Sequence, residues 1–300
     1  TVRYYNALTG GADISAVVVS TGWNVPVLAV GATVQFRAEV FAASGTATNT
    51  LMNMVVTATS AADGTKIDVV KAQTTALTRR MAELMIKIST DTNYTGNNTY
   101  NGTGVNQRVA VSTDPNSTAT YNIALVNDGN DDDIFIVTGP AALVGWGLSY
   151  FSAITDGDDI TAQITDTGFS TGIAAGATVY VRVEATPELT IAASSSMVVN
   201  VSAVSQYDSS AVDVVTASTT LTAFYEPDAS LKASAASEYI GAEIVNIDGN
   251  AQIAEADGSP DGAAVYYVQV LNNGNSADPF VVTGATGTGG WSVVYYDALT

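Results

Sequence analysis

An internal repeat with a period of about 145 residues limits the fold of this chain more than any other sequence feature. Residues 121–139 (YNIALVNDGNDDDIFIVTG) match 266–284 (YYVQVLNNGNSADPFVVTG), and the same offset aligns 145–146 with 290–291, a Gly-Trp pair in both places. Near the N-terminus the offset is 146. Successive copies of one sequence pattern predict successive copies of one folded unit.

The register of this repeat divides the chain into three parts. Residues 2–9 and 291–300 both match 146–155, so the sequence starts within one unit and stops within another. We therefore expect a C-terminal part of a unit at 1–76, one complete unit with an extra hairpin segment at 77–222, and the N-terminal part of the next unit at 223–300.

Most of each unit has the pattern of β-strands. Apolar and polar residues alternate along 33–40 (TVQFRAEV) and 178–184 (TVYVRVE), which places the apolar residues on one face of a strand. Turn residues recur about every 8–12 residues, a spacing typical of an antiparallel sandwich. Further strands are expected at 54–59, 121–126, 133–137, 197–203 and 213–215. The sequence NDGN at 127–130 predicts a hairpin turn between two of them.

One segment has helical spacing. Leu77, Met81, Leu84 and Ile88 could share a helix face, but the equivalent segment of the next unit contains Pro227, which argues against a long helix common to both. The chain is therefore predicted to be all-β, a series of β-sandwich repeats of about 145 residues.

Composition excludes several functions. The chain has no Cys and no His, and its 10 Lys and Arg stand against 29 Asp and Glu, for a net charge of −19. Such a chain cannot neutralise a phosphate backbone, so no nucleic-acid partner is expected. The usual zinc sites, disulfides and Ser-His-Asp triads are absent. No apolar run reaches 18 residues, so membrane insertion is not expected. Catalysis is not expected either, because no acidic pair has a recognisable context.

In the order of its motifs, the chain resembles the tandem immunoglobulin-like modules of bacterial and archaeal surface proteins, including CARDB-like and alpha-galactosidase-associated families. The shared order starts at 127 with N-x-G-N and continues with D-x-F-x-V-T-G, G-W and G-A-T-V-x-V-R-V-E. It ends with V-x-A-x-S and D-x-V near residue 215. The resemblance implies an immunoglobulin-like fold and an extracellular stalk, adhesin or filament role without catalysis.

The loop at 127–133 (NDGNDDD) carries oxygen-bearing side chains at alternate positions. Asp128, Asn130 and Asp132 have the 1-3-5 spacing of a calcium loop, which makes them candidate metal ligands. Against this, Asp133 stands where such loops have glycine, and the equivalent loop at 272–278 (NNGNSAD) lacks two of the acids. A structural turn is the favoured interpretation, and no other cofactor is expected.

Other candidate sites are weighed against simpler structural roles. Asn93, Asn97, Asn101 and Asn116 all begin N-x-[ST] sequons, which suggests a glycosylated surface hairpin; chance in a chain rich in Asn and Thr is the alternative. The repeated tryptophans at 146 and 291 are expected to pack between sheets rather than bind sugars. Arg37–Glu39 and Arg182–Glu184 are expected to be exposed cross-strand ion pairs.

A sandwich that lacks a third of its strands leaves open sheet edges and a half-covered core. We therefore expect residues 264–300 of one chain to complete the unit begun at 1–76 in the next, which gives a head-to-tail homopolymer at the cell surface. The alternatives are a segment of a longer tandem array and a carbohydrate-binding adhesin with a surface glycan as partner. The expected interface residues are Tyr4, Tyr5, Tyr266, Tyr267, Val268, Val270, Phe280, Val282 and Trp291.

Overall fold

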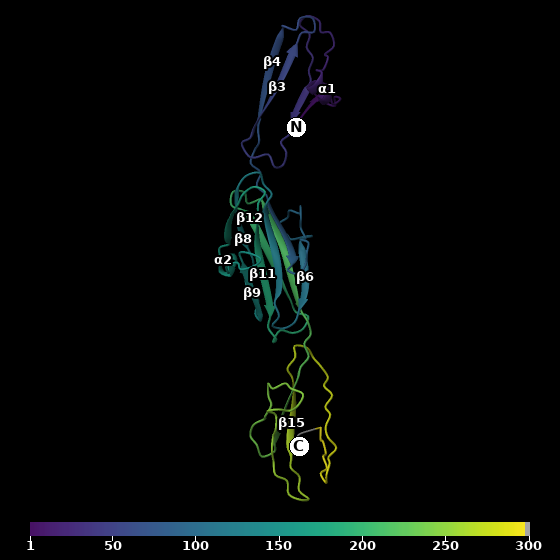
Figure 1. Ribbon diagram of the computed structural model, residues 1–300, viewed down its shortest axis with the longest axis vertical. Coiled ribbons are helices and arrows are strands. Elements are labelled where there is room, and N and C mark those ends of the chain that lie inside the picture. Colours follow the sequence, from purple (N-terminus) through teal and green to yellow (C-terminus); the bar gives the residue numbers. More distant parts are fainter. Residues whose placement is uncertain (298–300) are drawn as a thin grey trace.

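The computed structural model describes residues 1–297 and is all-β, as the sequence predicts. Figure 1 shows three bodies arranged end to end, with the N-terminus in one outer body and the C-terminus in the other. The helices in the described residues are two short ones, α1 (Ser15–Ser20) and α2 (Thr161–Thr165), at equivalent places in the repeat.

The middle body is an immunoglobulin-like sandwich of two sheets. One sheet has the strand order β10 (Phe169–Ile173), β8 (Asp133–Thr138), β12 (Ser196–Ser205), β13 (Val212–Leu221) and β6 (Arg108–Thr113). The other has the order β5 (Ala82–Ile88), β7 (Ala119–Asn127), β11 (Thr178–Pro187) and β9 (Trp146–Phe151). β6 runs parallel to β13, and the other pairs are antiparallel.

The core lies between these sheets and is built by alternation along each strand. Tyr121, Ile123 and Leu125 of β7 face inward and are fully buried, as are Val183 and Ala185 of β11. Every second side chain of a strand points to the same face, so the alternating pattern that predicts the strands also selects the core.

The segment with helical spacing forms a strand, β5, as the all-β prediction requires. Its residues Ala82, Leu84 and Ile86 alternate and are buried in the core, and β5 pairs with β7. The prediction of a hairpin turn at 127–130 is wrong, because the turn joins strands of different sheets and β7 and β8 do not pair. The segment from 89 to 107 forms no strand hairpin; it folds back on β5 through a single bridge between Ile86 and Thr95.

The N-terminal body, residues 1–76, contains two strand pairs. β1 (Val2–Tyr5) pairs with β2 (Arg37–Val40), and β3 (Leu51–Thr59) pairs with β4 (Ile67–Thr75). Their registers repeat those of the middle body: Tyr5 lies opposite Arg37 as Phe151 lies opposite Arg182. β1–β2 thus reproduces β9–β11, and β3–β4 reproduces β12–β13. We call this body the N-terminal half-sandwich.

The C-terminal body, residues 223–297 in the described part, contains one strand pair. β14 (Pro227–Ala233) pairs with β15 (Tyr266–Asn272), and Pro227 lies opposite Asn272 as Ala82 lies opposite Asn127. β14–β15 therefore reproduces β5–β7. The bridge between Leu231 and Ile240 repeats the one beside β5. We call this body the C-terminal half-sandwich.

The predicted cross-strand ion pairs lie within single strands instead. Arg37 Nε is 2.9 Å from Glu39 Oε1, and Arg182 Nε is 2.8 Å from Glu184 Oε1. Residues two apart on a strand share a face, so each pair forms along its own strand rather than across to a neighbour. Each guanidinium also stacks on the ring opposite, 4.3 Å from the Tyr5 centroid and 4.1 Å from that of Phe151.

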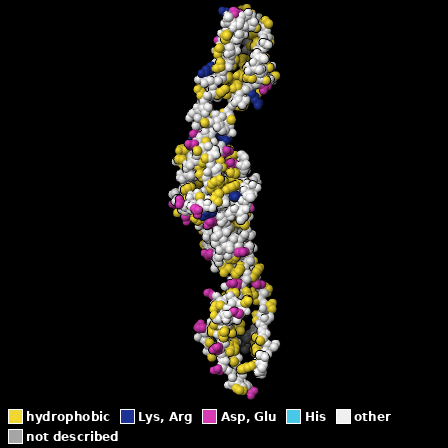
Figure 2. All heavy atoms as spheres, in the orientation of Figure 1, with side chains coloured by type: hydrophobic (Ala, Val, Ile, Leu, Met, Phe, Trp, Pro, Cys, Tyr) yellow, Lys and Arg dark blue, Asp and Glu magenta, His cyan; other side chains and the backbone are white. Residues whose placement is uncertain are grey.

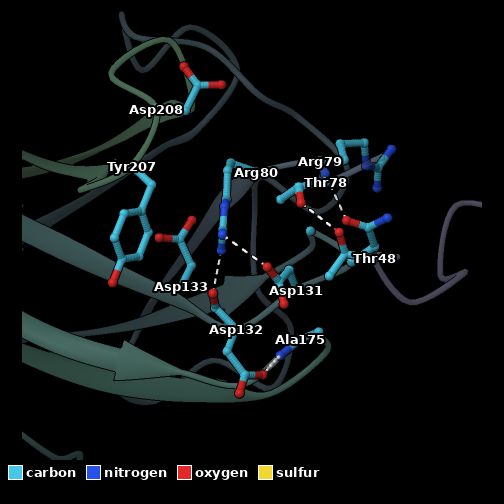
Figure 3. Close-up of polar contacts among 12 residues, drawn as sticks. Thr48, Thr78, Arg79, Arg80, Asp131, Asp132, Asp133, Ala175, Tyr207 and Asp208 are labelled. Carbon is cyan, nitrogen blue, oxygen red and sulfur yellow. Dashed lines mark hydrogen bonds and ion pairs between the residues drawn. The ribbon is translucent and has the colours of Figure 1, made fainter. Parts of the chain in front are cut away.

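An asparagine holds the joint between the first two bodies. The Asn130 amide donates to the carbonyls of Thr46 and Leu77, both at 2.9 Å, and its Oδ1 accepts from Arg79 N at 2.7 Å. Its main-chain oxygen accepts from Thr48 N at 3.2 Å. Figure 3 shows this region, including the contact of the Thr48 and Thr78 hydroxyls at 2.6 Å.

The joint between the second and third bodies repeats three of these four asparagine contacts. Asn275 accepts from Phe224 N at 2.7 Å and donates to Thr222 O at 3.0 Å, and its main-chain oxygen accepts from Ala193 N at 3.0 Å. Each contact is the equivalent of one at Asn130. The relation between neighbouring bodies is therefore part of the repeat.

Candidate subunit interface

The two half-sandwiches contain complementary strands of the middle sandwich. Four of its strands (β9, β11, β12 and β13) have counterparts formed in the N-terminal half, and two (β5 and β7) have counterparts formed in the C-terminal half. The counterparts of β6, β8 and β10 are at about 253–258, 278–283 and 23–28, and none of these segments is a strand.

Pairing partners explain which strands form. In the middle body, β6 pairs with β13 and β8 pairs with β10 and β12. The counterparts of β6 and β8 lie in the C-terminal half, whereas those of β13, β10 and β12 lie in the N-terminal half. A strand needs a neighbour to bond its backbone groups. Each unformed segment is therefore one whose partner lies in the other half.

Equivalent core residues are buried in the middle body and exposed in the halves. Val215 is 0% exposed and its N-terminal counterpart Val70 is 61% exposed. Val137 is 1% exposed and its C-terminal counterpart Val282 is 70% exposed. Figure 2 shows hydrophobic side chains gathered on the surfaces of both end bodies. The halves thus present apolar faces that a complete sandwich would cover.

The predicted interface residues divide by face. Tyr266, Val268, Val270, Phe280 and Val282 occupy positions whose middle-body counterparts are all buried in the core. Trp291, the counterpart of the buried Trp146, is 70% exposed. The expected packing between sheets is therefore confirmed for Trp146 and is wrong for Trp291, whose C-terminal half lacks the second sheet within residues 223–297.

The remaining three predicted residues differ. Tyr4 is already buried within its own half, where its N–H donates to Ser15 Oγ at 2.8 Å. Tyr5 lies under Arg37. Tyr267 lies opposite Lys232 on the other face of β15.

A buried carboxylate, Asp213, and its counterpart Asp68 are not among the residues predicted from the sequence. Burial raises the pKa of Asp213, although hydrogen bonds from Asn101, Leu84 and Gln107 act in the opposite direction. The repeat alignment places Asp68 beside Asp213, so the signal is present in the sequence. Its importance rests on contacts between residues more than 100 positions apart.

The three candidate calcium ligands have separate partners. Asp128 accepts from the Tyr100 hydroxyl, Asn130 forms the joint described above, and Asp132 Oδ1 accepts from Ala175 N at 3.2 Å. Arg80 lies against this loop, with its Nη2 3.0 Å from Asp131 Oδ2, and donates a hydrogen bond to the carbonyl of Asp132 (Figure 3). The loop's turn is closed by Gly129 N, which donates to Asn127 Oδ1 at 3.0 Å.

No group of three acidic side chains placed to hold a metal occurs among residues 1–297. The described helices also lack the length and apolar character needed to cross a membrane.

The sequon asparagines differ in accessibility. Asn93, Asn97 and Asn116 are exposed. The Asn101 amide donates to Val105 O at 3.0 Å, and its Oδ1 accepts from Thr103 and Val105. Glycosylation stays a prediction, with three of the four sites open to solvent.

No family model and no curated protein matches the chain. Three solved structures resemble parts of it. The major pilin subunit BcpA of Bacillus cereus is 10% identical, with 67% of this chain and 65% of the pilin covered and a TM-score of 0.32. The ASH/PapD-like domain 7 of human CEP192 is 11% identical, with 47% of this chain and 84% of that domain covered and a TM-score of 0.24.

The third structure is a chaperone–tip adhesin complex of CFA/I fimbriae. It is 10% identical, with 43% of this chain and 64% of that chain covered and a TM-score of 0.22. The chain thus spans less than two thirds of the pilin and of the fimbrial chain. At these TM-scores the matches carry no information about function.

Proposed function

We propose that this protein is a structural subunit of an extracellular filament or stalk, and that its chains assemble head to tail. The C-terminal half-sandwich of one chain completes the N-terminal half-sandwich of the next. One observation carries the proposal: the two halves hold complementary sets of strands in the registers of the middle sandwich.

The exposed core positions support the same contact. Docking one half on the other covers the apolar faces of β3, β4 and β15 and gives the unformed segments their missing partners. The gain combines apolar burial of about 25 cal/mol per Å² with new main-chain hydrogen bonds. The contact is heterologous, because different surfaces meet, and heterologous contacts that do not close produce filaments.

Composition and sequence resemblance support a structural role at the cell surface. A chain without His or Cys and with few bases lacks the usual groups for nucleophilic or metal chemistry. We place it with the tandem immunoglobulin-like surface modules that its motifs resemble, and we assign it no catalytic activity.

The middle sandwich supplies a register for the proposed contact. Tyr180 of β11 lies opposite Ala124 of β7. The repeat aligns these residues with Gln35 and Gln269, so the proposed contact places Gln35 opposite the partner's Gln269. Opposite residues of antiparallel strands have Cα atoms about 4.5–5.5 Å apart, a distance that a disulfide spans. The chain has no cysteine of its own, so an introduced pair reports on this contact without background.

The experiment is oxidation of the variant carrying both Gln35→Cys and Gln269→Cys. We expect a ladder of covalent multimers on a non-reducing gel. The pair Gln35→Cys with Leu271→Cys is two residues out of register and should give no ladder. Single chains only, or equal ladders from both pairs, would contradict the proposal. An array whose repeats continue within one longer chain would likewise give no ladder.

A further inference from the structure

One buried carboxylate ties the two sheets of the middle sandwich together. Asp213 is fully buried on β13, and its Oδ2 accepts from Leu84 N of the opposite sheet at 2.7 Å. Its Oδ1 accepts from Asn101 N at 2.9 Å and from Gln107 Nε2 at 2.6 Å. Hydrogen bonds to an ionised acceptor are about twice as strong as neutral ones.

The N-terminal half-sandwich carries the same carboxylate without these donors. Asp68 occupies the Asp213 position on β4 and is exposed. Within residues 1–297 its carboxylate accepts one hydrogen bond, from Val69 N at 2.9 Å, the equivalent of the 3.0 Å bond between Val214 N and Asp213. The other three donors come from β5 and the loop after it, and their counterparts lie in the C-terminal half.

The C-terminal half holds those counterparts, Ala229 on β14 and Asn246 and Gln252 in a preformed loop after it. Gly241 has φ +101°, as Gly96 has φ +108° in the middle body, and a Cβ at Gly241 would meet Gln252 Cγ at 3.0 Å. The glycine therefore lets the glutamine lie against the loop.

The backbone of this loop also repeats. Gln252 N donates to Gly249 O at 3.0 Å, as Gln107 N donates to Gly104 O at 3.1 Å. Gln252 differs from Gln107 in one contact. Its Nε2 donates to Ile244 O, whereas Nε2 of Gln107 donates to Asp213 and to Val214 O.

We propose that Asp68 is the binding site for a second copy of this chain. Its carboxylate accepts hydrogen bonds from the main-chain N–H groups of the partner's Ala229 and the partner's Asn246, and from Nε2 of the partner's Gln252. This inference rests on the proposed head-to-tail assembly and identifies the polar contact that holds two chains together. We call this set of hydrogen bonds to Asp68 the Asp68 lock. Apolar strands can slip in register, whereas one carboxylate fits one set of donors, so Asp68 also selects the register.

The first test compares Asp68→Asn with Asp63→Asn in the full chain. Asp63 lies in the turn beside β4 and bonds Thr65, so its variant makes the same charge change away from the proposed lock. Sedimentation should show the subunit contact about tenfold to a hundredfold weaker in Asp68→Asn and unchanged in Asp63→Asn. Equal dissociation constants for the two variants would overturn the proposal.

The second test uses the direction of the contact, which joins the N-terminal half of one chain to the C-terminal half of another. An Asp68→Asn chain keeps an intact C-terminal half, and a Gln252→Ala chain keeps an intact N-terminal half. Each alone should assemble poorly, and an equimolar mixture should form dimers that grow no further. This outcome also shows that both variants fold. A mixture that stays monomeric would overturn the lock.

The two tests separate this inference from the proposed function. If the cysteine pair at 35 and 269 gives its ladder while Asp68→Asn assembles normally, head-to-tail completion stands and the Asp68 lock is wrong. If the ladder itself fails, the proposed function is wrong.

Discussion

Phe280 and Phe135 form a matched pair whose truncation separates folding of the subunit from assembly. Phe135 lies on β8 and is fully buried in the core of the middle sandwich. Phe280 occupies the same position in the C-terminal half, where it is only half-buried and its segment is not a strand. The proposed contact buries Phe280 as the middle sandwich buries Phe135.

The expected magnitudes follow from this burial. Truncation of a fully buried Phe to Ala costs about 3–5 kcal/mol, so Phe135→Ala should lower the melting temperature of the middle sandwich by about 10 °C. Phe280→Ala should change the free subunit little. It should weaken the subunit contact by about 2–4 kcal/mol, because part of its burial exists already. That loss raises the dissociation constant about 30- to 1,000-fold.

The assay is sedimentation equilibrium for the contact and calorimetry for the subunit, on wild type, both Phe variants and Val144→Ala. Val144 is exposed on the middle body, so its variant controls for the loss of surface apolar area. An unchanged dissociation constant for Phe280→Ala would refute the reasoning. So would a drop in melting temperature equal to that of Phe135→Ala without any effect on assembly.

Two further predictions concern the joint and the buried acid. Asn130→Ala removes three side-chain hydrogen bonds at the joint, including the one to Thr46 of the N-terminal half-sandwich, so small-angle scattering should show a wider range of interbody angles, whereas the exposed Asn93→Ala should match wild type. Burial raises the pKa of Asp213 above its ordinary 3.8, so this group's contribution to stability is present below that value and is lost as pH rises through the raised pKa. When the unfolding free energy of the middle sandwich is plotted against pH, the Asp213→Asn variant should lack this group's part of the slope. Identical slopes for the variant and wild type would contradict the assignment.

The strand content of the chain was predictable because it rests on local alternation. Val34 and Phe36 alternate with polar residues and predict a strand from residue 33, yet β2 starts only at Arg37. Alternation describes what a strand would bury, but pairing decides whether it forms. β1 pairs only with residues 37–40 of this segment. The counterpart of β7, which would pair with residues 33–36, lies in the other half.

The site was less predictable because its contacts are distant in sequence. The calcium spacing at 128–132 is local, but Arg80, which lies against that loop, comes from about 50 residues earlier. The helical spacing from Leu77 to Ile88 is equally local, and β5 forms because β7 offers it a partner. Asp68 has no local signature at all, since the donors around Asp213 arrive from 106 to 129 residues away.

The middle sandwich explains why the halves would meet between chains rather than within one. The two half-sandwiches lie at opposite ends of it (Figure 1), and each is held there by an asparagine joint, through Asn130 at one end and Asn275 at the other. A loose linker would let the complementary halves of one chain find each other at high effective concentration and close on themselves. In the proposed assembly the middle sandwich acts instead as a spacer that keeps them apart, so that the contact that completes each half comes from another copy. In that assembly the repeated joints would give every contact along the polymer the same geometry, which is the condition for a regular fibre.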